Sequence, residues 1–171
     1  IQNNLQVLSV DERSGKFVEY SQRMQEHLHN YKNNFATVIN NRSLRRQLVQ
    51  TDVAVVYQQL HQQIEQNINQ SSGNSAWQLI KNEIQNSEIA LLRYLAQPDS
   101  THIKAFGRAY EAIQQQLGHI DETDASLLQT QLQQLHEHFY NVANVTRGYS
   151  FLVNVVMAGT ANEILFLSKQ L

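Results

Sequence analysis

The chain has 171 residues, a formal net charge of −2 and no cysteine. This length is enough for one domain with a substantial hydrophobic core. The slightly acidic balance argues against nucleic-acid binding, and the lack of cysteine excludes disulfide bonds and thiol catalysis.

Few residues in this composition interrupt helices. Proline occurs once and glycine six times, while glutamine, leucine and alanine, which tolerate helix well, are abundant. Apolar residues recur between the polar ones at intervals of three and four, the spacing of one helix face. The sequence therefore predicts an all-α protein.

The first predicted helix carries a heptad seam from residue 7 to residue 38. Asn40 and Asn41 predict a break or bend, after which a second apolar pattern runs from residue 43 to residue 69. The seam residues of the first helix are Val7, Val10, Ser14, Phe17, Ser21, Met24, Leu28, Tyr31, Phe35 and Val38.

Two shorter helices are predicted in the middle of the chain. The segment 69–75, NQSSGNS, is a loop by composition and is followed by a helical pattern from residue 75 to residue 96. The segment 97–101, QPDST, predicts a turn in which Asp99 or Ser100 caps the next helix. That helix is expected to end near Gly118.

The last predicted helix begins in the acidic segment 121–126 and meets no breaker for more than 45 residues. At 1.5 Å per residue its length is roughly 70 Å. Its second half is apolar almost all round, which predicts burial on several sides, by the bundle or by a partner subunit. Asn154, Asn162 and Glu163 interrupt this apolar run, so no membrane-spanning segment is expected.

These elements predict an up-and-down helical bundle with long first and last helices, in a single domain covering residues 1–171. In a bundle with an even number of long passes, both chain ends lie at the same end. Because the sequence starts at Ile1 without a methionine, we expect a segment of a longer protein.

The segment 40–50, NNRSLRRQLVQ, concentrates positive charge. Arg42 faces both Arg45 and Arg46 on a helix, and like charges at these spacings repel each other. No acidic residue occurs between Glu26 and Asp52 to relieve the repulsion. Because guanidinium groups match carboxylate, nitrate and phosphate oxygens, the three arginines are candidate ligands of an anion.

Two other interpretations of these arginines remain open at this stage. They could complement the carboxyl end of the first helix. They could also form ion pairs with the acidic residues of the segment 121–124. Arg93, Lys104, Arg108 and Arg147 are alternative sources of anion contacts that no spacing singles out.

Enzymatic and metal-binding functions find little support in the sequence. No nucleophile elbow and no glycine-rich phosphate loop is present, so no catalytic residue and no cofactor is expected. Glu26 and His29 form one copy of the Glu-x-x-His unit that di-iron bundles use twice. One copy is insufficient, and a carboxylate-bridged metal site is the least favoured interpretation.

The long outer helices resemble a known class of protein. Segments 17–38, FVEYSQRMQEHLHNYKNNFATV, and 146–171, TRGYSFLVNVVMAGTANEILFLSKQL, look like the outer helices of extracytoplasmic sensory domains of bacterial membrane receptors. The most similar types are the helical-bundle sensors of histidine kinases, such as the nitrate and trimethylamine-oxide sensor kinases, and of chemoreceptors. The nitrate sensor's ligand-binding signature is absent.

The resemblance implies a periplasmic, non-enzymatic sensor domain of an inner-membrane protein, in a two-component system and with flanking transmembrane helices outside this segment. Such domains usually work as homodimers, and they detect a small molecule or a ligand-loaded periplasmic binding protein. Binding displaces one helix against another and so transmits the signal. The alternative is a soluble helical scaffold or adaptor that binds a protein partner.

Overall fold

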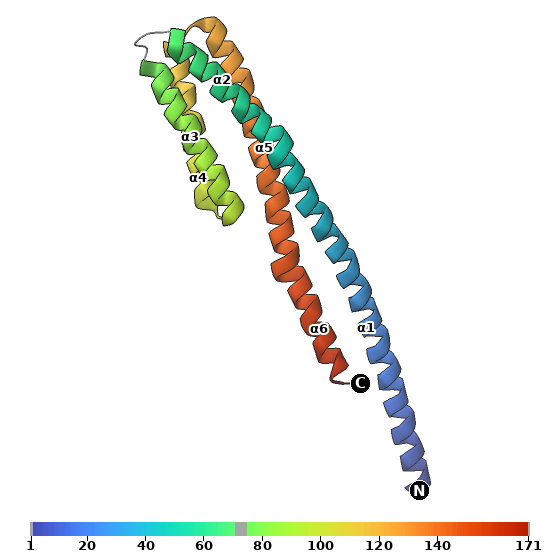
Figure 1. Ribbon diagram of the computed structural model, residues 1–171. Helices are drawn as coiled ribbons and strands as arrows, with labels where there is room; N and C mark the ends of the chain where they lie inside the picture. The colour runs from blue at the N-terminus through green and yellow to red at the C-terminus, as the bar shows by residue number, and fades with distance from the viewer. Residues whose placement is uncertain (1, 71–74, 171) are drawn as a thin grey trace. The chain divides into compact units, whose positions relative to one another are not determined.

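The computed structural model describes the backbone of residues 2–70 and 75–170, and side chains from residue 14 onwards. Every regular element in these ranges is helical, and the helices form four passes (Figure 1). The predicted fold class, an all-α up-and-down bundle with long first and last helices, is confirmed.

The first pass is one continuous helical path. Helix α1 (Gln2–Gln47) leads into the π-helical turn η1 (Leu48–Val53) and then into α2 (Ala54–Gln70). Of the break or bend predicted at Asn40 and Asn41, a break is wrong, since both residues lie within α1. Asparagine lowers helix propensity only slightly, and neither glycine nor proline occurs there to stop the helix.

The middle passes are α3 (Ser75–Ala96) and α4 (Ser100–Gln116), and α4 ends in the 3-10 turn η2 (Leu117–His119). The predicted cap is confirmed, because the Asp99 carboxylate accepts a hydrogen bond from the Thr101 backbone nitrogen at 2.7 Å. Hydrogen bonding from the Thr101 side chain, and then from its backbone nitrogen, lowers the pKa of Asp99. Residues 71–74 of the predicted loop lie outside the described part of the chain.

The last pass consists of α5 (Glu122–Phe151), the π-helical turn η3 (Leu152–Met157) and α6 (Ala158–Ser168). It spans 47 residues, which confirms the predicted length. Its first turn is capped by Asp121, whose carboxylate accepts a hydrogen bond from the Thr123 backbone nitrogen at 2.9 Å. Acidic residues at this end are also favoured by the helix dipole.

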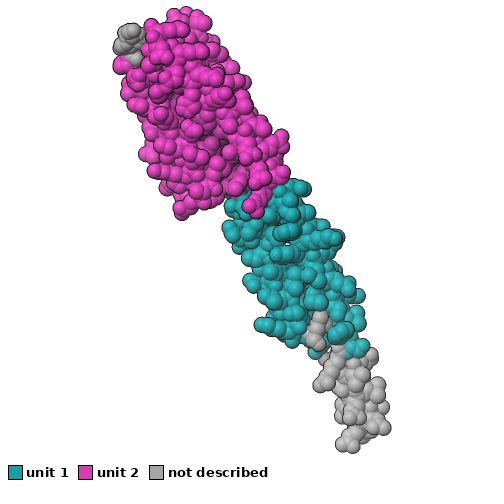
Figure 2. All heavy atoms as spheres, viewed as in Figure 1, with its two compact units in different colours: residues 1–41, 148–171 teal, residues 42–147 magenta. Residues whose placement is uncertain are grey.

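The chain divides into two compact units, shown in Figure 2. Unit 1 contains residues 1–41 and 148–171, and unit 2 contains residues 42–147. The first and last passes therefore contribute to both units, while α3 and α4 belong to unit 2 alone.

Unit 2 holds a four-helix core. One cluster of buried side chains joins α2, α3, α4 and α5, and at its centre the rings of Phe106 and Phe139 stack with centroids 3.8 Å apart. Fully buried members of the cluster include Leu60, Ile64, Trp77, Ile80, Ile84, Ile113, Leu128, Leu132 and Leu135. Burial of this much apolar surface is the main stabilising contribution to unit 2.

Unit 1 pairs the start of the chain with its end. The Arg23 guanidinium of α1 donates a hydrogen bond to the Glu163 carboxylate of α6 at 2.8 Å. Among the described side chains of this unit, Val38, Met157 and Leu167 are the buried ones. Large apolar side chains stay exposed on both helices, namely Phe17, Val18, Leu28, Phe35, Ile39, Phe151, Val155, Leu165 and Phe166.

This exposure differs from the burial predicted for the second half of the last helix. Phe151 and Leu165 are 57% and 58% exposed. By length and composition, the pass from Glu122 to Ser168 is also long and apolar enough to cross a membrane, contrary to expectation, and only 11% of its most apolar window is buried. Contiguous exposed apolar surface of this kind is typical of sites that contact protein or lipid.

The two π-helical turns change which residues face inward. In the first pass the inward residues Arg45, Val49 and Val53 are separated by two successive steps of four, one residue more than the heptad allows. In the last pass Met157 is buried, whereas the preceding Val156 is half-buried. Because a π turn holds an extra residue, it absorbs each shift without ending the helix.

Candidate functional site

The three predicted site arginines lie in the last turns of α1, within unit 2. Arg42 and Arg46 are exposed, and Arg45 is half-buried. Because α1 passes directly into η1, the helix has no free carboxyl end here. The arginines therefore do not complement a helix terminus, as one of the alternative interpretations required.

The half-buried Arg45 and Arg147 of α5 both influence the same tyrosine, Tyr94. Burial raises the pKa of the Tyr94 hydroxyl, while the positive charges of Arg147 and Arg45 act to lower it. The same hydroxyl donates a hydrogen bond to the backbone oxygen of Ala143 at 3.1 Å. Arg45 and Arg147 thus lie near one tyrosine. We define the arginine face as Arg42, Arg45, Arg46 and Arg147.

The acidic segment 121–124 is not the partner of this face. The Gln63 side chain donates a hydrogen bond to the Asp124 backbone oxygen at 3.4 Å, so the acidic segment lies beside Gln63. Gln63 follows Arg46 by 17 residues, which is roughly 25 Å along a helix. Within the described residues, Arg42, Arg46 and Arg147 form no ion pair shorter than 4.0 Å.

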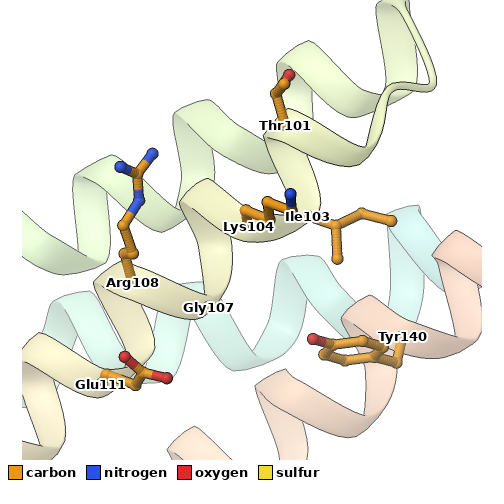
Figure 3. A pocket seen from close by; sticks show the side chains of 7 residues that line it. All are labelled: Thr101, Ile103, Lys104, Gly107, Arg108, Glu111 and Tyr140. Atoms are coloured by element: carbon orange, nitrogen blue, oxygen red, sulfur yellow. The ribbon is translucent and has the colours of Figure 1, made fainter.

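Two hollows flank α4 in unit 2. The first has a volume of about 510 Å³ and lies between α4 and Tyr140 of α5 (Figure 3). The second has a volume of about 430 Å³, lies between α3 and α4, and includes Arg93 and His102 in its lining. Arg108 lines both. Arg42, Arg45 and Arg46 line neither of them, whereas Arg93, Lys104 and Arg108, the alternative sources of anion contacts, do.

The first hollow has an apolar middle and a charged rim. Figure 3 shows the ring of Tyr140 on α5 facing the stretch of α4 that contains Ile103 and Gly107. Lys104 and Arg108 lie one helical turn apart on α4. Both line the hollow, and neither forms an ion pair shorter than 4.0 Å within the described residues.

The Tyr140 ring packs against other aromatic rings of unit 2. The His136 ring lies between two tyrosines, with centroids 4.8 Å from Tyr110 and 4.6 Å from Tyr140. Tyr140 also meets Phe139 edge-on at 5.7 Å. Aromatic pairs at these distances are stabilising, so they restrict the orientation of the Tyr140 ring.

A separate polar network joins α2 and α3. The Tyr57 hydroxyl lies 2.9 Å from the Ser87 hydroxyl, and Nε2 of His61 lies 3.4 Å from the Glu88 carboxylate. Lys81 forms an ion pair with Glu65 on the same pair of helices. These groups satisfy one another, which indicates a structural role in helix pairing.

The described side chains contain no group of three or more metal-ligating residues close enough to hold an ion. In the Glu-x-x-His unit, Glu26 and His29 are both exposed, and His29 interacts with the Asn33 amide at 3.0 Å.

The first hollow was not predicted as a site, although two signals for it were present in the sequence. Lys104 and Arg108 repeat the four-residue spacing of Arg42 and Arg46, and Gly107 interrupts the interior of a helix. These two features indicate a binding site only in the folded chain, where Tyr140 of α5 lies opposite them.

Comparison of the chain with known protein families, with curated proteins and with solved structures finds no match.

Proposed function

We propose that the chain is the extracytoplasmic sensory domain of a bacterial membrane receptor, of the two-component histidine-kinase type. The observation that carries this proposal is the construction of unit 1. Its two helices, one from each end of the chain, are joined by the pair Arg23–Glu163 and leave broad apolar surface exposed.

The exposed surface of unit 1 suits a second copy of the same chain. In α1, Met24, Tyr31 and Val38 are at least half-buried, while the alternating seam residues Leu28 and Phe35 are 49% and 51% exposed. Two helices thus bury only one side of the heptad seam. Two copies bring four helices together, and a twofold dimer of this kind buries both sides.

The arginine face suits a negatively charged partner protein. Its side chains are mostly exposed, and no described hollow is lined by Arg42, Arg45 or Arg46. An extended, exposed positive surface favours contact with the acidic surface of a protein, and it accelerates association. In a periplasmic sensor this partner is a ligand-loaded binding protein.

A sensor of this construction transmits signals through its long helices. The first and last passes each contribute residues to both units. In the proposed sensor, a change in unit 2 is passed along these two helices. Packed helices adopt discrete arrangements, and ligand binding selects one of them.

The proposal is tested by inserting the chain between the two transmembrane helices of a reporter histidine kinase. The chain contains no cysteine, so a single introduced cysteine reports one position. We expect Leu28→Cys and Phe35→Cys to form cross-linked dimers in membranes and to change kinase autophosphorylation when cross-linked. Leu92→Cys, which is 59% exposed in unit 2, serves as the control and should not cross-link.

The alternative is a soluble scaffold that presents the same apolar stripe to another protein. It predicts a monomer without cross-links and a kinase output that does not depend on unit 1. That result would reject the sensory proposal. The triple variant Arg42→Ala, Arg45→Ala, Arg46→Ala tests the partner surface, and an unchanged response to a binding protein would reject its role.

A further inference from the structure

We infer that the hollow between α4 and α5 binds a small monocarboxylate with a flat apolar body, of the aromatic-acid type. This inference rests on the proposed function in one respect, because it names the ligand class that such a sensor would detect. Binding itself is a property of unit 2 and is measured without any signalling readout.

The size and lining of the hollow match a small organic ligand. Ligand sites in proteins usually have volumes of roughly 300–1,000 Å³, with mostly apolar walls and a few polar groups. The hollow has about 510 Å³, and its middle is formed by Ile103, Gly107 and Tyr140 (Figure 3). A ring or short chain in this position would lie against the Tyr140 ring.

Gly107 keeps this position open. A Cβ atom added at Gly107 would meet nothing within 4 Å, so helix packing does not require a glycine there. Glycine in a helix interior is unfavourable relative to alanine. Its effect on this face is to leave free the space between the α4 backbone and Tyr140, and any larger side chain would project into that space.

The positive rim selects for a carboxylate. Lys104 and Arg108 repel each other across one turn of α4, and an anion between them would relieve that repulsion. Arginine binds carboxylates through two parallel hydrogen bonds, and such charge-assisted bonds are the strong ones. The lysine contributes a second positive charge next to the apolar middle.

Glu111 restricts the ligand to one negative charge. It lines the same hollow one turn beyond Arg108, and its own carboxylate would repel a second anionic group. A dicarboxylate is therefore disfavoured. The same repulsion weakens the binding of a monocarboxylate, so removing the charge of Glu111 should strengthen that binding.

The test uses isothermal titration calorimetry of the purified chain with three probes. Phenylacetate has both the ring and the carboxylate, phenylacetamide has the ring alone, and acetate has the carboxylate alone. We expect saturable binding of phenylacetate and binding at least about tenfold weaker for the other two probes, because each lacks one of the two contacts.

Variants then place the site. Lys104→Gln and Arg108→Gln should each weaken phenylacetate binding about tenfold through loss of a charge-assisted contact. Gly107→Leu should abolish binding by filling the space, whereas Glu111→Gln should strengthen it. Arg93→Gln is the matched control, since Arg93 lines only the second hollow. Thermal unfolding shows whether each variant is folded, and Tyr140→Leu provides a second test of the apolar wall.

Several results would overturn the inference. These are absence of phenylacetate binding, equal binding of phenylacetamide, and full binding by a folded Gly107→Leu variant. Loss of binding in Arg93→Gln or in the triple arginine variant, with Lys104→Gln unaffected, would place the ligand elsewhere. Binding that behaves as expected, together with an unresponsive reporter kinase, would instead reject the sensory function and leave the site in place.

Discussion

Tyr57 and Ser87 form a buried hydroxyl pair between α2 and α3, with their oxygen atoms 2.9 Å apart. Ser87 already donates its proton to the Ile84 backbone oxygen at 2.7 Å, so Tyr57 is the donor in the pair. Removing the acceptor leaves a buried tyrosine hydroxyl unsatisfied, whereas removing the tyrosine hydroxyl leaves Ser87 with its own acceptor. We expect Ser87→Ala to lower the free energy of unfolding by about 1–3 kcal/mol and Tyr57→Phe by about 1 kcal/mol.

Urea unfolding of the two variants and of the double variant measures this difference. The double variant should be less destabilised than the sum of the single changes, because the two residues interact. A larger effect of Tyr57→Phe than of Ser87→Ala would show that the donor assignment is wrong.

The stability of the protein should fall at alkaline pH because of the same tyrosine. Burial is the largest cause that raises the pKa of Tyr57 above its usual value of 10.0. Because of the raised pKa, the Tyr57 hydroxyl stays protonated in the folded protein at pH values where it has begun to lose its proton in the unfolded chain. The stabilisation is therefore complete below about pH 10, and above it falls by about 1.4 kcal/mol per pH unit until the folded-state pKa is reached.

Unfolding by urea at about pH 8 and at about pH 11 tests this dependence. Tyr57→Phe should reduce the difference between the two pH values. The control is Tyr140→Phe, at an exposed tyrosine. This variant should show the same difference in the free energy of unfolding between the two pH values as the unchanged chain.

The stacked pair Phe106–Phe139 should be the most sensitive point of the unit 2 core. Both side chains are almost fully buried. Phe139→Ala should lower the free energy of unfolding by about 3–5 kcal/mol, since it removes apolar contacts and leaves a cavity. Leu92→Ala on the exposed side of α3 should change stability by less than about 0.5 kcal/mol.

Self-association should depend on unit 1 and not on exposed apolar residues in general. Leu28→Asn and Phe35→Asn introduce polar groups into the proposed dimer interface, so they should raise the dimer dissociation constant at least about tenfold. Leu92→Asn introduces the same group at an equally exposed site in unit 2. Analytical ultracentrifugation should show no effect of this control, and an equal effect would contradict the proposed interface.

The helical passes followed directly from local patterns. The 3-4 spacing of apolar residues, the capping Asp99 and the acidic start of α5 act over one or two turns, and each is visible in a short segment. The break predicted at Asn40 and Asn41 was wrong because a pattern that acts over one or two turns does not include the packing around it. A locally weaker helix is retained when packing on either side favours its continuation.

The arginine cluster was visible in the sequence as uncompensated charge, but its surroundings were not. Arg45 and Arg147 both act on Tyr94, and the acidic segment 121–124 lies beside Gln63. Both relationships depend on how the helices align. The hollow beside Tyr140 likewise joins residues of α4 and α5 that no local pattern relates.

By itself, the amino-acid sequence determined the all-α class, the long first and last passes and most of the turns, because helix propensity, capping and periodicity are short-range effects. Only the tertiary structure decided the burial of Met157, the exposed stripe of unit 1 and the position of the hollow. Those features depend on which faces meet after packing, and a π turn of one extra residue is enough to change the face that is presented.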